Sequence, residues 1–276
     1  MKHFRLAMAL TAAVAFTACK KDSQQVMHHG AQDETDALTQ VNGFTEKPPV
    51  IISESGDIQA AVQQFRDLLG PLSLNETMTG GRREINWDNV HLFMTNNNNF
   101  PGTYFNRTDP EGPFMQKTGV LLTTPGAGFR VSNNHFSDID SSYNDEFIPF
   151  SGLKNLVALQ SNTIDINFKK PGTDKTGYVQ GFGVVFNDVN VEGSTTVTLY
   201  SGKMLIGTYR VKIADTGGAS FLGIYLPGKK ITRARLILGQ APIGKGIKDV
   251  CDSDTGYDLV ALDDLIFSVP QGANLK

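Results

Sequence analysis

The sequence predicts a mostly β protein, an antiparallel β-sandwich of jelly-roll-like form with one N-terminal helix. Its second half contains eight short segments with the composition of strands, and no helical period separates them. Charged and apolar residues alternate in some of these segments, as around Arg233 and Arg235, which indicates a sheet with one face in water. A single apolar stripe at helical spacing precedes the strands.

The first 18 residues predict a lipoprotein signal peptide. A short basic head with Lys2 and Arg5 leads into an apolar run over residues 6–16. This run is too short to cross a bilayer, which takes roughly 20 residues of helix. Small residues precede Cys19, as a lipoprotein signal peptidase requires. We therefore expect cleavage before Cys19 and a membrane anchor of lipid, such as palmitate, on that cysteine.

The residues after Cys19 predict an envelope protein on a tether. Lys20, Lys21 and Asp22 follow the lipid site and favour sorting to the outer membrane. Residues 19–52 are polar and contain few large apolar side chains, so we expect them to form a disordered tether.

Cysteine content and charge exclude two further features. With Cys19 consumed by lipid, Cys251 is the one cysteine left, so the mature chain forms no internal disulfide. The formal net charge is −3, and loss of Lys2 and Arg5 with the signal peptide takes it to −5. No basic stripe is present, which argues against nucleic acid as a partner.

Residues 53–150 are expected to form a helix and irregular strands that pack on the sandwich. The apolar stripe over residues 58–69 predicts the helix as the first ordered element, with Asp57 as its N-cap and Gly70 as its stop. Alternation over residues 84–90 predicts a half-buried strand, and residues 120–123 and 128–132 predict two short strands. Residues 91–118 are rich in Asn, Pro and Gly and predict loops.

Residues 151–270 are expected to form the sandwich, and residues 271–276 a tail. The predicted strands are residues 156–160, 163–168, 179–189, 195–200, 204–213, 220–226, 231–238 and 259–269. Ser201 and Gly202 predict a two-residue hairpin turn between two of them.

Two segments resemble a known family. Residues 80–88 read Gly-Gly-Arg-Arg-Glu-Ile-Asn-Trp-Asp, and residues 100–106 read Phe-Pro-Gly-Thr-Tyr-Phe-Asn. With the helix at 58–69 and looser segments at 124–129, 181–189, 220–224 and 262–265, they resemble an uncharacterised family of exported bacterial proteins. The resemblance covers most of the chain after residue 57. It implies a jelly-roll-like C-terminal part and an exported location, and it leaves function open because no activity is established for the family.

A row of polar residues is the main candidate for ligand binding. On a strand, side chains at every second position share one face, which would align Arg82, Glu84, Asn86 and Asp88. One interpretation is a grip on a polar ligand, and another is an acid and base pair of a glycosidase formed by Glu84 and Asp88. A third is a solvated strand face with ion pairs and no ligand.

Acidic residues in the late strands are candidates for a structural calcium ion. Asp188, Asp263 and Asp264 lie at or in these strands, and Asp249, Asp252, Asp254 and Asp258 crowd the loop before the last one. Calcium takes six to eight oxygen ligands, so clustered carboxylates suit it. The spacing does not match an EF-hand, and an acidic loop in solvent is the alternative.

Aromatic residues in the loops complete the candidate set. Tyr104, Phe105, Tyr143 and Phe147 are expected to be exposed where sugar-stacking residues would lie, or else to cap the ends of the core. The favoured function is non-catalytic binding at the cell envelope, with a glycan as ligand, through the polar row together with Tyr104 and Phe105. The alternatives are the hydrolase and a purely structural surface protein.

Overall fold

The computed structural model describes residues 48–75, 78–215, 217–250 and 255–273. They belong to one compact unit. The signal peptide, Cys19, Cys251 and the tether up to residue 47 lie outside the described residues, so these remain predictions. Within the described part, no helix has the length and apolar character needed to cross a membrane.

The strands form two main sheets. The larger sheet contains β1 (Val50–Ser55), β2 (Arg82–Ile85), β4 (Gly128–Ser132), β5 (Asn155–Leu159), β8 (Gly181–Asn187), β11 (Ala219–Tyr225) and β13 (Ala261–Ser268). The smaller sheet contains β3 (Val120–Thr123), β6 (Thr163–Phe168), β9 (Thr196–Ser201), β10 (Met204–Arg210) and β12 (Arg233–Ile237). The other elements are α1 (Gln59–Leu69), three 3-10 turns, η1 (Leu92–Met94), η2 (Phe114–Gln116) and η3 (Ser141–Asp145), and a small ribbon of β7 (Gly177–Tyr178) with β14 (Gln271–Gly272).

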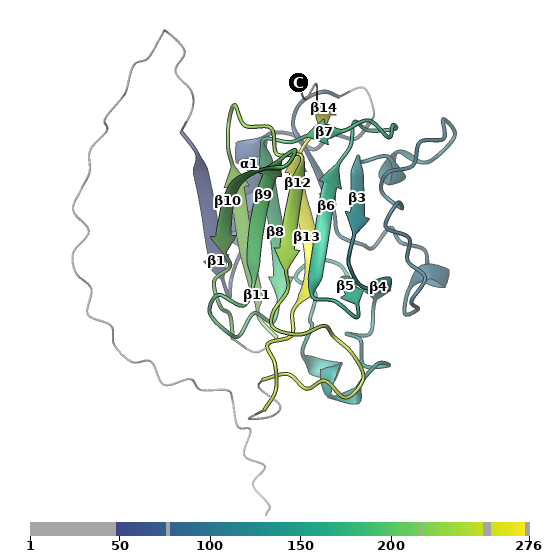
Figure 1. Ribbon diagram of the computed structural model, residues 1–276, viewed down its shortest axis with the longest axis vertical. Helices are drawn as coiled ribbons and strands as arrows, with labels where there is room; N and C mark the ends of the chain where they lie inside the picture. The colour runs from purple at the N-terminus through teal and green to yellow at the C-terminus, as the bar shows by residue number, and fades with distance from the viewer. Residues whose placement is uncertain (1–47, 76–77, 216, 251–254, 274–276) are drawn as a thin grey trace, which may run out of the picture. The chain divides into compact units, whose positions relative to one another are not determined.

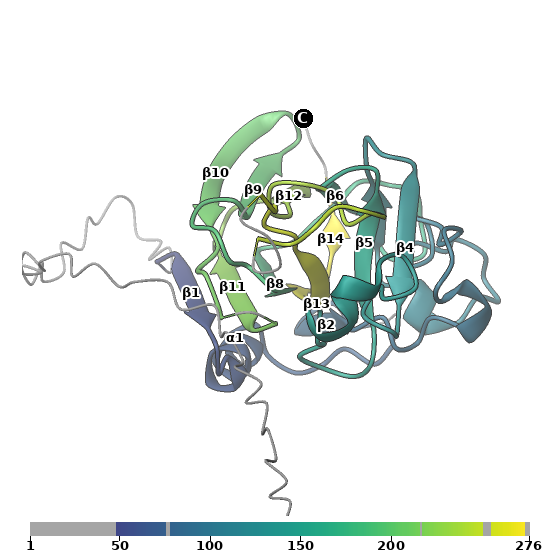
Figure 2. The same ribbon diagram turned by 90° about the horizontal axis from the view of Figure 1, so that it is seen from below.

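The two sheets pack as an antiparallel sandwich, which confirms the predicted fold class (Figures 1 and 2). The larger sheet follows the order β1-β11-β8-β13-β5-β4, with β2 also paired to β13, and the smaller follows β10-β9-β12-β6-β3. All eight strands expected between residues 156 and 269 are present. Because neighbours in each sheet come from distant parts of the chain, residues far apart in sequence meet at the strand ends.

The main core lies between the sheets. Alternate residues of both sheets fill it, such as Val184 and Phe186 of β8 facing Val197 and Leu199 of β9. The outer face of the smaller sheet is polar, and Arg235 on β12 forms a bidentate ion pair there with Asp165 on β6. The prediction of one water-facing sheet surface therefore holds for the smaller sheet.

Helix α1 covers part of the outer face of the larger sheet, and glycines make its approach possible. A Cβ on Gly183 or Gly223 would lie 2.6 or 2.7 Å from the Phe65 ring. Phe65 is fully buried against Val185, Phe221 and Ile266 in a second apolar cluster. The continuous burial of β8 follows, because the core covers one of its faces and α1 covers the other.

Three boundaries differ from the sequence prediction. Among the described residues, the first regular element is β1 and not the helix, and it begins at Val50, inside the segment expected to be tether. Helix α1 begins at Gln59 without a side-chain cap and ends at Gly70 as predicted. Gln271–Gly272, expected to lie in a tail, form β14 with β7. A short strand such as β1 acquires its order from pairing with β11, a contact that local sequence does not encode.

Strand β2 is shorter than predicted because the backbone turns away after it. The strand ends at Ile85, and Trp87 takes a left-handed conformation with φ 62°. The Trp87 indole is buried and donates a hydrogen bond to the main-chain oxygen of Asp263. This burial holds the backbone of Trp87 in a conformation that residues other than glycine seldom adopt. The polar row therefore loses its strand alternation after Ile85.

The expectation that the loop aromatics are exposed is wrong. Tyr104 and Phe105 are 7% and 2% exposed and pack with Trp87 and Phe100 in the main core. Their rings meet edge to face, with centroids 5.7 Å apart between Trp87 and Phe105. A third cluster buries Tyr143 and Phe147 completely under the larger sheet. These four side chains close the ends of the core, as the alternative interpretation had it.

Candidate functional site: two pockets beside helix α1

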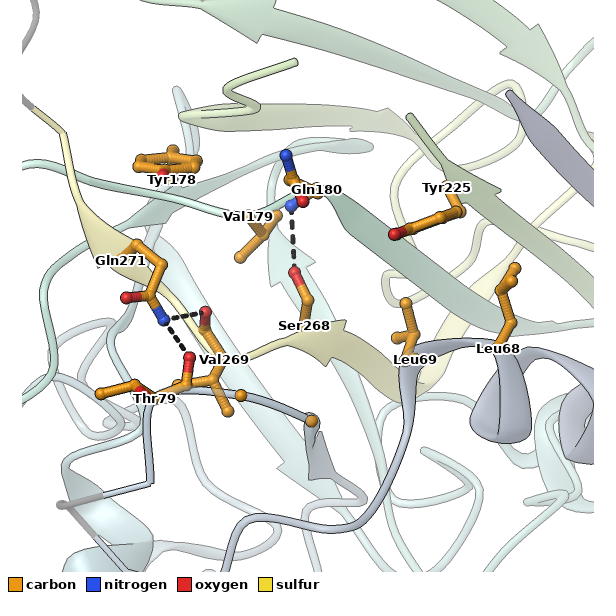
Figure 3. A pocket seen from close by; sticks show the side chains of 12 residues that line it. Leu68, Leu69, Thr79, Tyr178, Val179, Gln180, Tyr225, Ser268, Val269 and Gln271 are labelled. Carbon is orange, nitrogen blue, oxygen red and sulfur yellow. Dashed lines mark hydrogen bonds between the residues drawn. The ribbon is translucent and has the colours of Figure 1, made fainter. Parts of the chain in front are cut away.

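A neutral pocket opens beside the end of α1 (Figure 3). It has a volume of about 240 Å³. We call it the neutral pocket; its lining is Leu68, Leu69, Thr79, Gly80, Gly81, Tyr178, Val179, Gln180, Tyr225, Ser268, Val269 and Gln271. None of these described lining residues carries a charge.

Glycines and strand order create the neutral pocket. Strands β11, β8 and β13 are adjacent, so Tyr225, Gly181 and Ser268 come together near their ends. A Cβ on Gly181 would lie 2.3 Å from Leu69 and 3.2 Å from the Tyr225 ring, so glycine leaves space for both side chains. On the opposite wall Gly81 has φ +82°, and a Cβ there would lie 2.1 Å from the Pro71 oxygen.

Hydrogen bonds fix the polar walls of the neutral pocket. The hydroxyl of Ser268 accepts bonds from the main-chain N–H groups of Gln180 and Gly181, at 3.0 and 3.3 Å. The Gln271 amide nitrogen donates to the main-chain oxygens of Thr79 and Val269, at 2.6 and 3.1 Å. Figure 3 shows the bond between Gln180 and Ser268 and the bonds of Gln271, with the Tyr178 and Tyr225 rings on either side of Gln180. Both tyrosines are partly exposed, so the pocket offers two aromatic rings, the Gln180 amide and the amide oxygen of Gln271 to a ligand.

A charged pocket of about 230 Å³ lies near α1 and β2. We call it the charged pocket; its lining is Arg66, Leu72, Ser73, Leu74, Arg83, Glu84, Asn86, Asn89, Phe114, Met115, Thr118, Ser151 and Asp264. Glu84 bonds Arg66 at 3.0 and 2.8 Å and Arg82 at 2.6 Å. The Arg83 guanidinium is buried, donates to the Lys117 oxygen at 3.0 Å and lies 5.0 Å from the centroid of the Phe114 ring. The charges of this pocket therefore bond largely to the protein itself.

Two adjacent acids of β13 lie behind the charged pocket. The pairing of β13 with β8 shifts between Leu262 and Leu265, which turns Asp263 and Asp264 into the protein interior. Asp264 accepts a hydrogen bond from the Ser151 hydroxyl at 2.7 Å, and Asp263 accepts one from the Phe150 N–H. Burial, then the charge of Asp264, raise the pKa of Asp263 to about 8. Burial also raises the pKa of Asp264.

The structure brings only part of the predicted polar row together. Glu84 and Asn86 line the charged pocket, while Arg82 bonds Glu84 and the main-chain oxygen of Gly70. Asp88 is separate: its carboxylate accepts the Leu153 N–H at 2.9 Å and lies against Gly152. Strand β2 ends at Ile85, so Asn86 and Asp88 do not continue a regular strand row with Arg82 and Glu84.

The predicted calcium ligands also separate. Asp188 lies apart from the Asp263 and Asp264 pair and forms a cluster with Glu146 and Asp249. The sequence prediction places Asp249 in the acidic loop but does not include Glu146, because nothing in the sequence around Glu146 indicates a ligand site. Tyr178, Gln180, Tyr225 and Gln271 were missed for the same reason. Their one signal was Gly181, a glycine at the start of a buried strand.

Comparison with models of known protein families and with curated protein sequences gave no match. The geometry of the two pockets and of the acidic clusters is thus the basis for the functional argument.

Proposed function

We propose that the protein is a non-catalytic glycan-binding module, held on the cell envelope by lipid, and that the neutral pocket binds an uncharged sugar residue. The observation that carries this proposal is the pairing of two partly exposed tyrosine rings with two glutamine side chains in a pocket without charge. Sugars present apolar C–H faces and many hydroxyls. Aromatic rings suit the faces, and amides that both donate and accept suit the hydroxyls.

The size of the neutral pocket supports one sugar residue as the bound unit. Pockets for drug-sized ligands measure roughly 300–1,000 Å³, above the 240 Å³ found here. Its walls are set by main-chain hydrogen bonds to Ser268 and Gln271, so little ordering is needed when a ligand enters. None of the described lining residues carries a charge, and the cation nearest to the Tyr178 ring is Lys230, whose Nζ lies 5.4 Å from the ring centroid.

The hydrolase alternative receives less support from the geometry. Both carboxylate oxygens of Glu84 already accept hydrogen bonds from Arg66 or Arg82, so this side chain is engaged within the protein. Asp88 bonds the Leu153 N–H and does not line the pocket with Glu84. A retaining or inverting mechanism needs both carboxyl groups across one cleft.

Attachment to the envelope rests on the sequence around Cys19. We infer that this cysteine carries the lipid and that the sandwich faces its ligand from the membrane surface, with the outer membrane as the favoured location. Metabolic labelling with radioactive palmitate should label the protein, and Cys19→Ser should abolish both the label and membrane retention. A labelled Cys19→Ser variant would contradict the anchor.

Glycan binding is tested on an array of neutral oligosaccharides (cello-, xylo-, manno- and chito-oligomers) and acidic ones (oligogalacturonides). We expect binding to a neutral series. Tyr178→Ala and Tyr225→Ala should each weaken it about 3- to 10-fold, since an aromatic contact contributes about 0.5–1.5 kcal/mol beyond its area. Tyr200→Ala is the matched control, because Tyr200 is a partly exposed tyrosine that stacks on Arg233 away from this pocket.

Two results would overturn the proposal. Loss of binding in Tyr200→Ala, with binding retained in Tyr178→Ala and Tyr225→Ala, would move the site to the smaller sheet. Absence of binding to every neutral series, with the fold intact by circular dichroism, would leave the structural surface protein as the better account.

A further inference from the structure

A second site lies in the loops at strand ends, where three buried carboxylates meet. Glu146 follows η3, Asp188 follows β8, and Asp249 lies in the segment before β13. One carboxylate oxygen from each lies within 4.8 Å of the others. The three residues are 7%, 0% and 0% exposed, so water does not screen their mutual repulsion.

Asp188 contributes a buried carboxylate oxygen to the cluster. Its Oδ1 accepts hydrogen bonds from the Gly217 N–H at 2.8 Å and the Asn190 amide at 3.1 Å, and neither donor carries a charge. Its Oδ2 is buried and has no hydrogen-bond partner among the residues that the structure describes. The backbone of Asp188 is also left-handed, with φ 71°, which a side chain seldom adopts without a reason in its surroundings.

We propose that Glu146, Asp188 and Asp249 bind a divalent cation, calcium, that joins three loops of the sandwich. The donors are carboxylate oxygens, which suit a hard cation and not zinc or copper. The main-chain oxygens of Asp145 and Glu146 lie 3.2 Å from where a Cβ of Gly217 would stand, and the Gly217 N–H bonds Asp188, so the η3 and Gly217 segments pack together beside the cluster. Calcium accepts six to eight oxygens and irregular geometry, whereas magnesium demands a near-octahedral set.

A proton is the alternative occupant. In the absence of a cation, burial and the charge of Asp249 raise the pKa of Asp188 to about 9. The cluster can thus be neutralised in two ways, and only a bound cation gives calcium-dependent stability. The proposal differs from the sequence prediction, which grouped Asp188 with Asp263 and Asp264. Those two lie at another place, where Ser151 and Phe150 donate to them.

The test is calcium titration of the full-length protein, purified in detergent and stripped of metal with a chelator. We expect one calcium per chain by calorimetry and by metal analysis. At calcium one hundred times Kd, the melting temperature should rise by about 5–10 °C, since the ion binds the folded state alone. Magnesium at the same concentration should raise it far less.

Variants localise the ion. Asp188→Asn and Glu146→Gln should each weaken calcium binding by more than about tenfold, because even outer-shell changes at metal sites cost 10- to 100-fold. Asp165→Asn is the matched control, a carboxylate of the smaller sheet that pairs with Arg235, and should bind calcium as the parent does. Asp188→Asn should also melt higher than the parent in chelator, because the variant no longer has to bury a carboxyl group at this position.

Two results would overturn the proposal. In the first, calcium added to the metal-stripped parent protein produces no binding heat in calorimetry and no change of melting temperature. A proton alone would then neutralise the cluster. The other is calcium binding that survives in both Asp188→Asn and Glu146→Gln, which places the ion elsewhere. If either variant does not fold, the stoichiometry and melting response of the parent still decide whether the folded protein holds calcium.

Discussion

The two pockets beside α1 have nearly the same volume and opposite chemistry. The charged pocket contains the residues that stand out in the sequence, yet Glu84 is bonded by Arg66 and Arg82, and Asp264 by Ser151. None of the described residues that line the neutral pocket carries a charge. A cluster of charged residues in a sequence therefore indicates ion pairs and hydrogen bonds within the protein as often as it indicates a ligand site.

The physical reason is the cost of burying ions. A partly buried carboxylate loses water, and the protein must return the lost interactions through cations and donors of its own. Amides and phenols lose less, so a pocket made of them can keep hydrogen-bonding groups open to a ligand. We therefore propose that the charged pocket contributes to stability and that the neutral pocket contributes to binding.

The largest expected effect is a pH dependence of the folding stability, which arises from Asp263 behind the charged pocket. The pKa of Asp263 is raised to about 8 by burial and by Asp264, so the folded state holds a proton that the unfolded chain releases near pH 4. The contribution of this Asp263 proton to the folding stability is complete below pH 4, and it is lost as the pH rises toward 8. Urea denaturation should show a loss on the order of 3 kcal/mol between pH 5 and 8.

The variant Asp263→Asn isolates this contribution. An amide imitates the protonated carboxyl, so the variant should lose much less stability than the parent over the same pH range. Sugar binding in the neutral pocket should not change between pH 5 and 8 in either protein. Equal pH slopes for parent and variant would mean that Asp263 does not hold the proton.

The next effect is the loss of the ion network. Glu84→Ala leaves Arg66 and Arg82 partly buried without their carboxylate and should lower the unfolding free energy by about 2 kcal/mol. This corresponds to a fall in melting temperature of roughly 4–8 °C for a chain of this size. Neutral-sugar affinity should stay within about twofold of the parent, a difference of about 0.4 kcal/mol.

A matched control for the Glu84 variant is Asp109→Ala. Asp109 pairs with Arg107 at the surface, with both side chains more than 40% exposed, so its loss should change the unfolding free energy much less than the loss of Glu84. A stable Glu84→Ala protein that no longer binds sugar would place the ligand in the charged pocket.

The fold was predictable for segments that bury one face, because the buried face imposes a regular spacing of apolar residues on the sequence. The eight late strands and α1 show periods of two and 3.6 residues, and all are present. Trp87 broke the pattern because its buried indole, bonded to Asp263, turns the backbone after β2. No local period encodes that contact across the sheet.

The sites were less predictable because topology assembles them. Tyr225 and Gly181 meet only since β11 pairs with β8, and Gln271 joins them through β14. Glu146 and Asp188 likewise meet across loops. The sequence did mark Asp188 as a possible ligand, but it could not reveal that a shift in β13 would turn Asp263 and Asp264 elsewhere.

The most direct test of the account is to map where a neutral oligosaccharide binds, by amide chemical-shift changes in the isotope-labelled protein. The account predicts shifts at Gln180, Tyr225 and Gln271 that saturate with the sugar, and none at Arg66, Glu84 and Asp264. Shifts confined to Arg66, Glu84 and Asp264 would contradict it, because the charged pocket and not the neutral one would then be the binding site.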